Sequence, residues 1–119
     1  MEGHLTYKIG DTDRVFFFGN YALEETLNHF DASISDISDL LNKKFFTFMR
    51  VFIFHAASYP VLKNNEVIDF NALDVHEWID QTGGATGGLM TASAKEIYRC
   101  LGMSAEPESD NQKKSKKKS

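Results

Sequence analysis

The feature that most constrains the fold of this chain is a Phe-rich apolar run near its middle. From Phe45 to Tyr59 the sequence reads FFTFMRVFIFHAASY, and Pro60 follows directly. Strands are usually about 5–6 residues long, so a run of this length favours a helix that ends at the proline. A helix that is apolar on almost every side needs neighbours on most sides, or a partner subunit on one of them. The chain is therefore expected to fold around this segment.

The same run is not expected to cross a membrane. Its most apolar part, Phe45 to Ala57, has 13 residues and contains Arg50 and His55, whereas a membrane span needs about 20 apolar residues. The start of the chain shows no cationic segment followed by an apolar one, the pattern of a secretory signal. We therefore expect a protein of the cytoplasm.

The N-terminal residues predict a β-hairpin. Two β-prone runs, Leu5–Ile9 and Arg14–Phe18, flank the turn-forming residues Gly10–Asp13. Apolar residues occupy every second position of the first run, which gives the hairpin one apolar face. A lone hairpin is marginal in water, so it is expected to pack against the rest of the chain.

The remaining body carries four further helical patterns. They run from Asn20 to Phe30, from the Ser33 restart to Lys44, from Ala72 to Gln81 and from Leu89 to Leu101. Asn20, Ser33 (with Asp36 completing a capping box) and either Asn71 or Asp69 are the predicted helix caps. The expected fold is therefore mainly α with a short N-terminal β-hairpin, a small helical domain of about five helices.

Charge divides the chain into two parts. Residues 1–102 carry 8 basic and 14 acidic side chains, and their composition predicts one folded domain. Residues 103–119 carry five lysines against three acidic residues and no large aliphatic or aromatic side chain, which predicts a disordered lysine-rich tail. The lysines could bind nucleic acid or another acidic surface, or could only keep the chain soluble. These candidate binding residues are Lys113, Lys114, Lys116, Lys117 and Lys118.

No pattern of catalytic or metal-binding residues stands out. No two of the four histidines have the i, i+4 spacing of a helical metal site, and the single cysteine, Cys100, excludes a Cys-based zinc site. His55 could be a buried acid or base, but a hydrogen-bonded or interface histidine is favoured. Asp74, Glu77 and Asp80 share a helix face and are interpreted as a solvated stripe rather than a cation site.

The glycine-rich segment from Thr82 to Gly88 is the feature that most suggests an enzyme. A P-loop ends in Gly-Lys-Ser/Thr, whereas Leu89 and Met90 follow here, and no strand leads into the segment. Two helix ends joined by permissive residues explain it better. We therefore expect no enzyme, no cofactor and no metal.

The Phe-rich helix is also the candidate surface for a protein partner. Five of the ten residues from Phe45 to Phe54 are phenylalanine, more aromatic surface than a small domain needs inside. Some of it could face a partner or a second copy of the chain, although every Phe could equally be core. The candidate contact residues are Phe45, Phe48 and Phe52.

The order of these elements resembles one known family. The hairpin leads into GNYALEETL at 19–27. A polar break and a short helix ending in Leu40-Leu41 then precede the long apolar helix. After that helix, LDVHEWID at 73–80 meets a Gly-Gly loop before the last helix. Across residues 5–102 this resembles the tail assembly chaperones of long-tailed phages and the small tail proteins of gene-transfer agents. The connection at 63–70 and the number of Phe residues in the long helix depart from the family pattern.

The resemblance implies a mostly helical, non-enzymatic protein that acts in the host cytoplasm. Its partners would be the tape measure protein, which such chaperones bind and coat, and the tail tube protein, which they help to recruit. A longer form made by ribosomal frameshifting near the lysine codons is a further implication. The alternative is a small nucleic-acid-associated regulatory protein that acts through its basic tail. The acidic body disfavours it, because DNA-binding folds usually concentrate positive charge on the fold itself.

Overall fold

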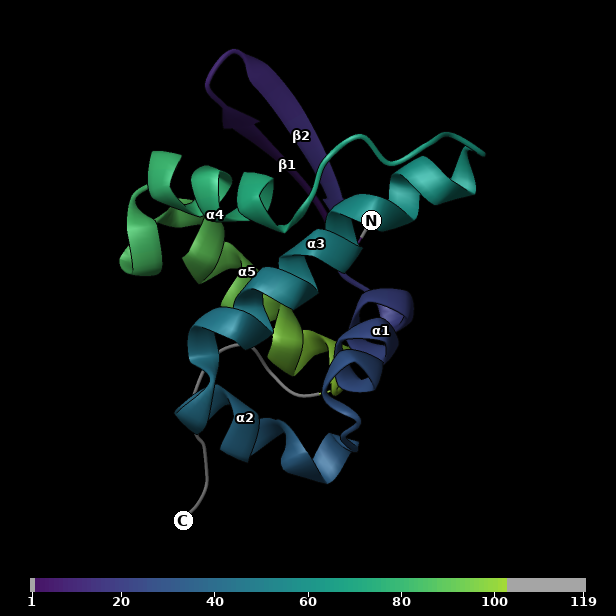
Figure 1. Ribbon diagram of the computed structural model, residues 1–119, viewed down its shortest axis with the longest axis vertical. Helices are drawn as coiled ribbons and strands as arrows, with labels where there is room; N and C mark the ends of the chain where they lie inside the picture. The colour runs from purple at the N-terminus through teal and green to yellow at the C-terminus, as the bar shows by residue number, and fades with distance from the viewer. Residues whose placement is uncertain (1, 103–119) are drawn as a thin grey trace.

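The computed structural model describes residues 2–102 and confirms the expected fold class (Figure 1). A two-stranded antiparallel hairpin is followed by five α-helices, with short 3₁₀ turns at Ile34–Asp36 and Gly84–Thr86. The elements are β1 (His4–Ile9), β2 (Thr12–Phe17), α1 (Asn20–Phe30), α2 (Ile37–Lys43), α3 (Phe45–Lys63), α4 (Ala72–Gln81) and α5 (Gly88–Cys100). The predicted disordered tail, 103–119, lies outside the described residues.

The hairpin turn is tighter than predicted. Ile9 lies opposite Thr12, so only Gly10 and Asp11 form the turn, instead of four residues. Gly10 adopts a φ of +63°, a left-handed conformation that glycine reaches without steric cost. The hairpin packs on α3 as expected, and Phe16 lies fully buried in that contact region.

Helix α3 forms the centre of the molecule. It contacts β2 and all four other helices, and Figure 1 shows it running between α1 and α4. The prediction that Pro60 ends this helix is wrong, since α3 continues to Lys63. Proline inside a helix donates no hydrogen bond, and its ring crowds the carbonyl four residues earlier, but its φ is compatible with a helix. The Pro60 carbonyl still accepts a hydrogen bond from Asn64 N at 3.2 Å. The chain therefore gains one more turn beyond the proline.

The extra turn changes the membrane argument. With 19 residues and a mean hydropathy of 1.3, α3 is long and apolar enough to cross a membrane by length and composition alone. Length alone therefore does not exclude a span, and the expectation that this segment does not cross a membrane stays a prediction. Of its most apolar window, 44% is buried inside this fold, so the apolar composition also suits a central core helix.

The predicted helix starts are confirmed at two places and wrong at one. Asn71 caps α4, because its side-chain oxygen accepts from Asp74 N at 3.0 Å while the Asp74 carboxylate accepts from Asn71 N at 2.9 Å. The Ser33 capping box is also present, although it opens a 3₁₀ turn before α2. Asn20 is the first residue of α1 and not its cap. Extended Gly19 takes that place, and its carbonyl accepts from Leu23 N at 3.1 Å.

The buried faces of two helical segments differ from the sequence pattern. In α5 Tyr98 follows the apolar spacing of the helix but is 43% exposed, whereas Leu89 and Ser93 are fully buried. Ile34 has the spacing of the apolar residues of α2 but is 62% exposed, because it belongs to the 3₁₀ turn that precedes α2. The interior itself is one contiguous cluster that joins β2 and all five helices.

Candidate functional site

The structure places the three candidate contact phenylalanines of α3 in or beside the core. Phe48 and Phe52 have no exposed surface, so neither contacts a partner in this fold. Phe48 stacks on Phe30 of α1 with ring centroids 6.0 Å apart, and Phe52 lies 5.2 Å from Phe18. Phe45 is partly buried at the start of α3. The side of α3 chosen from the sequence is thus its core side, because α1 and the end of the hairpin cover it.

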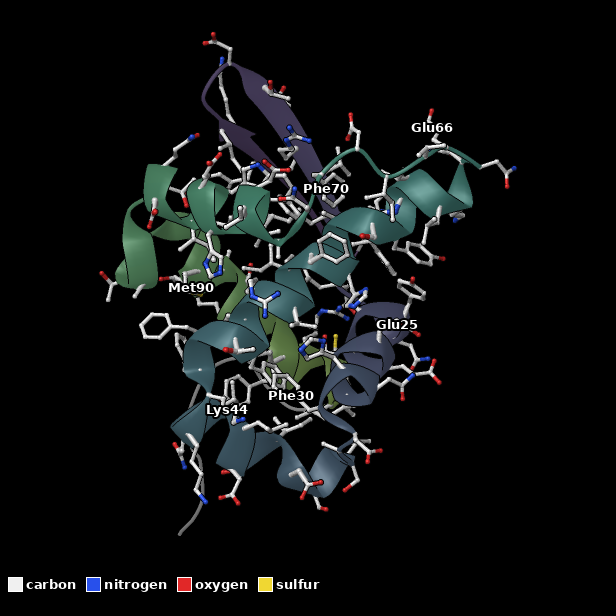
Figure 2. The ribbon with its side chains drawn as sticks, in the orientation of Figure 1. Glu25, Phe30, Lys44, Glu66, Phe70 and Met90 are labelled. Carbon is white, nitrogen blue, oxygen red and sulfur yellow. The ribbon has the colours of Figure 1, made fainter. Side chains whose placement is uncertain are left out.

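The open side of α3 carries a different set of residues. Phe46 is 63% exposed, and Arg50 and Phe54, both partly buried, follow at four-residue intervals on the same side of the helix. Phe54 packs against Phe70 with ring centroids 5.4 Å apart. In Figure 2 the labelled Phe70 lies over α3 on the side turned to the viewer. We call Phe46, Arg50, Phe54 and Phe70 the α3 stripe.

Arg50 lies in the middle of the α3 stripe and is its charged residue. Within residues 2–102 its guanidinium makes no hydrogen bond and no ion pair with another side chain. Guanidinium groups usually bind carboxylates when they are partly desolvated. The α3 stripe therefore offers apolar contacts on both sides of a cation that has free hydrogen-bond donors.

An aromatic surface continues from the α3 stripe toward the hairpin. Phe70 lies 5.3 Å from Trp78 of α4, and the guanidinium of Arg14 stacks over the Trp78 ring at 4.8 Å. Beside them a hollow of about 160 Å³ opens between β2, α3 and the loop before α4. Its lining includes half-exposed Val15 and Pro60. Such a hollow has room for one apolar side chain rather than for a cofactor.

His55 lies between α1 and α3 and has an unusual environment. Its ring meets Tyr21 and Phe54 edge-on, at 6.1 and 5.3 Å, and its Nδ1 atom is buried without a hydrogen-bond partner in the described part of the chain. Burial lowers the pKa of His55, with a small opposing effect from Glu25 and a further lowering by His29. The surroundings of the ring therefore disfavour the charged form of this imidazole.

Close backbone and side-chain contacts account for the glycines of the glycine-rich loop. Gly83 follows α4 with a φ of +106°. A Cβ on Gly87 would collide with the carbonyl oxygen of Thr82, and a Cβ on Gly88 would collide with the hydroxyl of Tyr7. These glycines let the loop fold onto itself and let α5 start against the hairpin.

Within residues 2–102, the other residues considered for catalysis or metal binding do not gather at one place. Asp74 serves the α4 cap, while Glu77 and Asp80 are exposed. Over residues 2–102 no three His, Cys, Asp or Glu side chains gather as a metal site. Burial raises the pKa of the Cys100 thiol, which lies 3.6 Å from the Phe18 carbonyl oxygen. The lysine candidates 113–118 lie outside the described residues.

Sequence reasoning missed Phe46 and Phe54, although one signal pointed to them. Arg50 is the only charged residue between Phe45 and Leu62, and a charge in an apolar helix marks the side that is not enclosed. Its neighbours four residues before and after are these two phenylalanines.

Comparison with protein-family models, with characterised proteins and with solved structures finds no match for this chain.

Proposed function

We propose that this chain is a non-enzymatic tail assembly chaperone of a phage, a prophage or a gene-transfer agent. It binds the tape measure protein in the host cytoplasm and helps to recruit tail tube subunits around it. The observation that carries the proposal is the α3 stripe, where Phe46 stays 63% exposed on the central helix of a small domain. Aromatic residues and arginine are enriched at protein-binding surfaces.

The arrangement of elements supports the same proposal. The hairpin, α1, the long apolar α3, and α4 followed by its Gly-Gly turn into α5 occur in the order on which the family resemblance rests. Helix-in-groove binding is the usual way in which a helical partner is held, and it uses apolar anchors one helical turn apart. Phe46 and Phe54 lie eight residues, or about two turns, apart on α3, with Arg50 one turn from each.

Co-expression with a tape measure protein tests the proposal. The partner is the longest helix-rich protein encoded beside this chain's gene, and its solubility and co-purification are measured with and without this chain. The proposal expects the partner to be insoluble alone and to co-purify as a soluble complex. A partner that stays insoluble in the presence of this chain contradicts it. Binding to duplex DNA that disappears with residues 103–119 favours the alternative, a nucleic-acid-associated regulator.

A further inference from the structure

We infer that the α3 stripe is the docking site for an amphipathic helix that bears a carboxylate beside its apolar face. The inference deepens the proposed function and rests on it in taking a helical protein as the partner. It names the surface that holds this partner, and it adds the charge that the partner must carry.

The apolar half of the inference follows from spacing and exposure. Phe46 and Phe54 lie two turns apart on one side of α3, so they match the i, i+4, i+8 period of an apolar helix face laid along them. Phe70 widens the stripe next to Phe54, at 5.4 Å between ring centroids. In the view of Figure 1, α1 and α4 flank α3.

The charged half of the inference follows from Arg50. Covering the stripe removes the guanidinium from water, and a desolvated charge is costly unless a partner carboxylate replaces the lost hydration. The described residues supply no such carboxylate, because their ion pairs involve Lys43 and Arg99 and not Arg50. The incoming helix must therefore bring an Asp or Glu opposite Arg50.

Arg50 also disfavours a second copy of this chain as the occupant. A two-fold axis through the middle of the stripe would bring the Arg50 residues of the two copies together. Like charges in close contact are destabilising, and desolvation increases that cost. A helix from another protein that carries a carboxylate would form an ion pair with Arg50 instead, and such a partner is favoured for this reason.

The test uses the full-length chain and two synthetic helical peptides that share one apolar face. One carries Glu and the other Lys at the position that flanks this face, and binding is followed by fluorescence anisotropy at low salt. We expect the Glu peptide to bind at least about tenfold more tightly than the Lys peptide. The Arg50→Glu variant is expected to reverse that preference, and Phe46→Asp to abolish binding of both peptides.

The matched control is Ile34→Asp. Ile34 is 62% exposed, nearly the same as Phe46 at 63%, but it belongs to the 3₁₀ turn before α2. This variant is expected to bind as the wild type does. Circular dichroism checks that each variant is folded, and Phe46→Ala replaces any Phe46→Asp protein that is not.

Several outcomes would overturn the inference. They are equal binding of the two peptides, no binding of either, or an Arg50→Glu variant that keeps the wild-type preference. Sedimentation that shows a dimer lost in Phe46→Asp would assign the stripe to a second copy instead. Peptide binding needs no tape measure protein, so failure of this test is distinct from failure of the co-expression experiment.

Discussion

Helices α3 and α4 pack against each other, but they distribute apolar and polar side chains differently between their buried and exposed sides. α4 buries Val75, Trp78 and Ile79 and turns charged residues such as Glu77 to solvent, together with Leu73, which is 70% exposed. α3 is apolar almost all round, and its open side still carries Phe46. The comparison teaches that the pattern of a helix with a polar side reveals which side is buried, whereas the pattern of a helix that is apolar all round does not.

Truncation of Phe52 tests the core side of α3, and it is expected to have the largest effect on stability. Phe52 is fully buried, so Phe52→Ala should lower the free energy of unfolding by about 3–5 kcal/mol. Phe46→Ala, on the open side, is expected to stay within about 0.5 kcal/mol of wild type. Urea unfolding midpoints measure both. Similar losses for the two variants would mean that α3 has no free side.

The Gly87→Ala variant tests the loop that follows α4, and it is expected to have the next largest effect on stability. The new Cβ would lie only 2.6 Å from the Gly83 Cα and would force the backbone apart, at a cost of about 2–3 kcal/mol. Gly84→Ala is the control, since no atom lies within 4 Å of its Cβ and only its positive φ costs about 1 kcal/mol. Thermal unfolding of both variants measures the difference. Equal stability of the two would contradict the packing account of this loop.

Loss of the α4 cap is expected to have a smaller effect. Asn71→Ala removes the acceptor of the Asp74 N–H bond, at a cost of about 1 kcal/mol. Asn20 makes no cap bond in α1, so Asn20→Ala should change the stability by less than about 0.5 kcal/mol. Urea unfolding of the two variants compares them. A larger loss at Asn20 would mean that α1 is capped by that side chain after all.

The smallest expected effect is a pH dependence at His55, where α3 meets α1. Because burial lowers its pKa below the ordinary 6.5, the unfolded chain takes up the proton more readily than the folded one. Stability is therefore unaffected above that pH and falls as the pH drops below it. Tyr21, Glu25 and His29 are the titratable groups that face or couple to this ring.

Urea midpoints measured between pH 7.5 and pH 5 check this expectation. His55→Gln cannot take up the proton, so part of the loss of stability at acidic pH should disappear in this variant. His76→Gln, at an exposed position of α4, is expected to keep the wild-type slope. The same slope in His55→Gln and in wild type would exclude His55 as its source.

Much of α4 could be predicted from the sequence, and little of the α3 surface could. The α4 cap, its bounds and its glycine end are all local signals, and each is confirmed. For α3 the sequence predicted a helix correctly but could not separate candidate contact residues such as Phe48 and Phe52 from core residues, because a run without a polar face has no pattern that selects a side. Only Arg50 carried that information. The site on the lysine tail, 113–118, stays a prediction.

The sequence by itself determined the kind and order of the elements, a hairpin followed by five helices. These depend on turn residues, caps and side-chain periodicity, which act between residues close in the chain. The tertiary structure alone decided which phenylalanines are core and that Gly88 lies against the side chain of Tyr7. Those answers depend on contacts between distant residues, such as Phe18 with Phe52 and Tyr7 with the start of α5. No local pattern encodes such contacts.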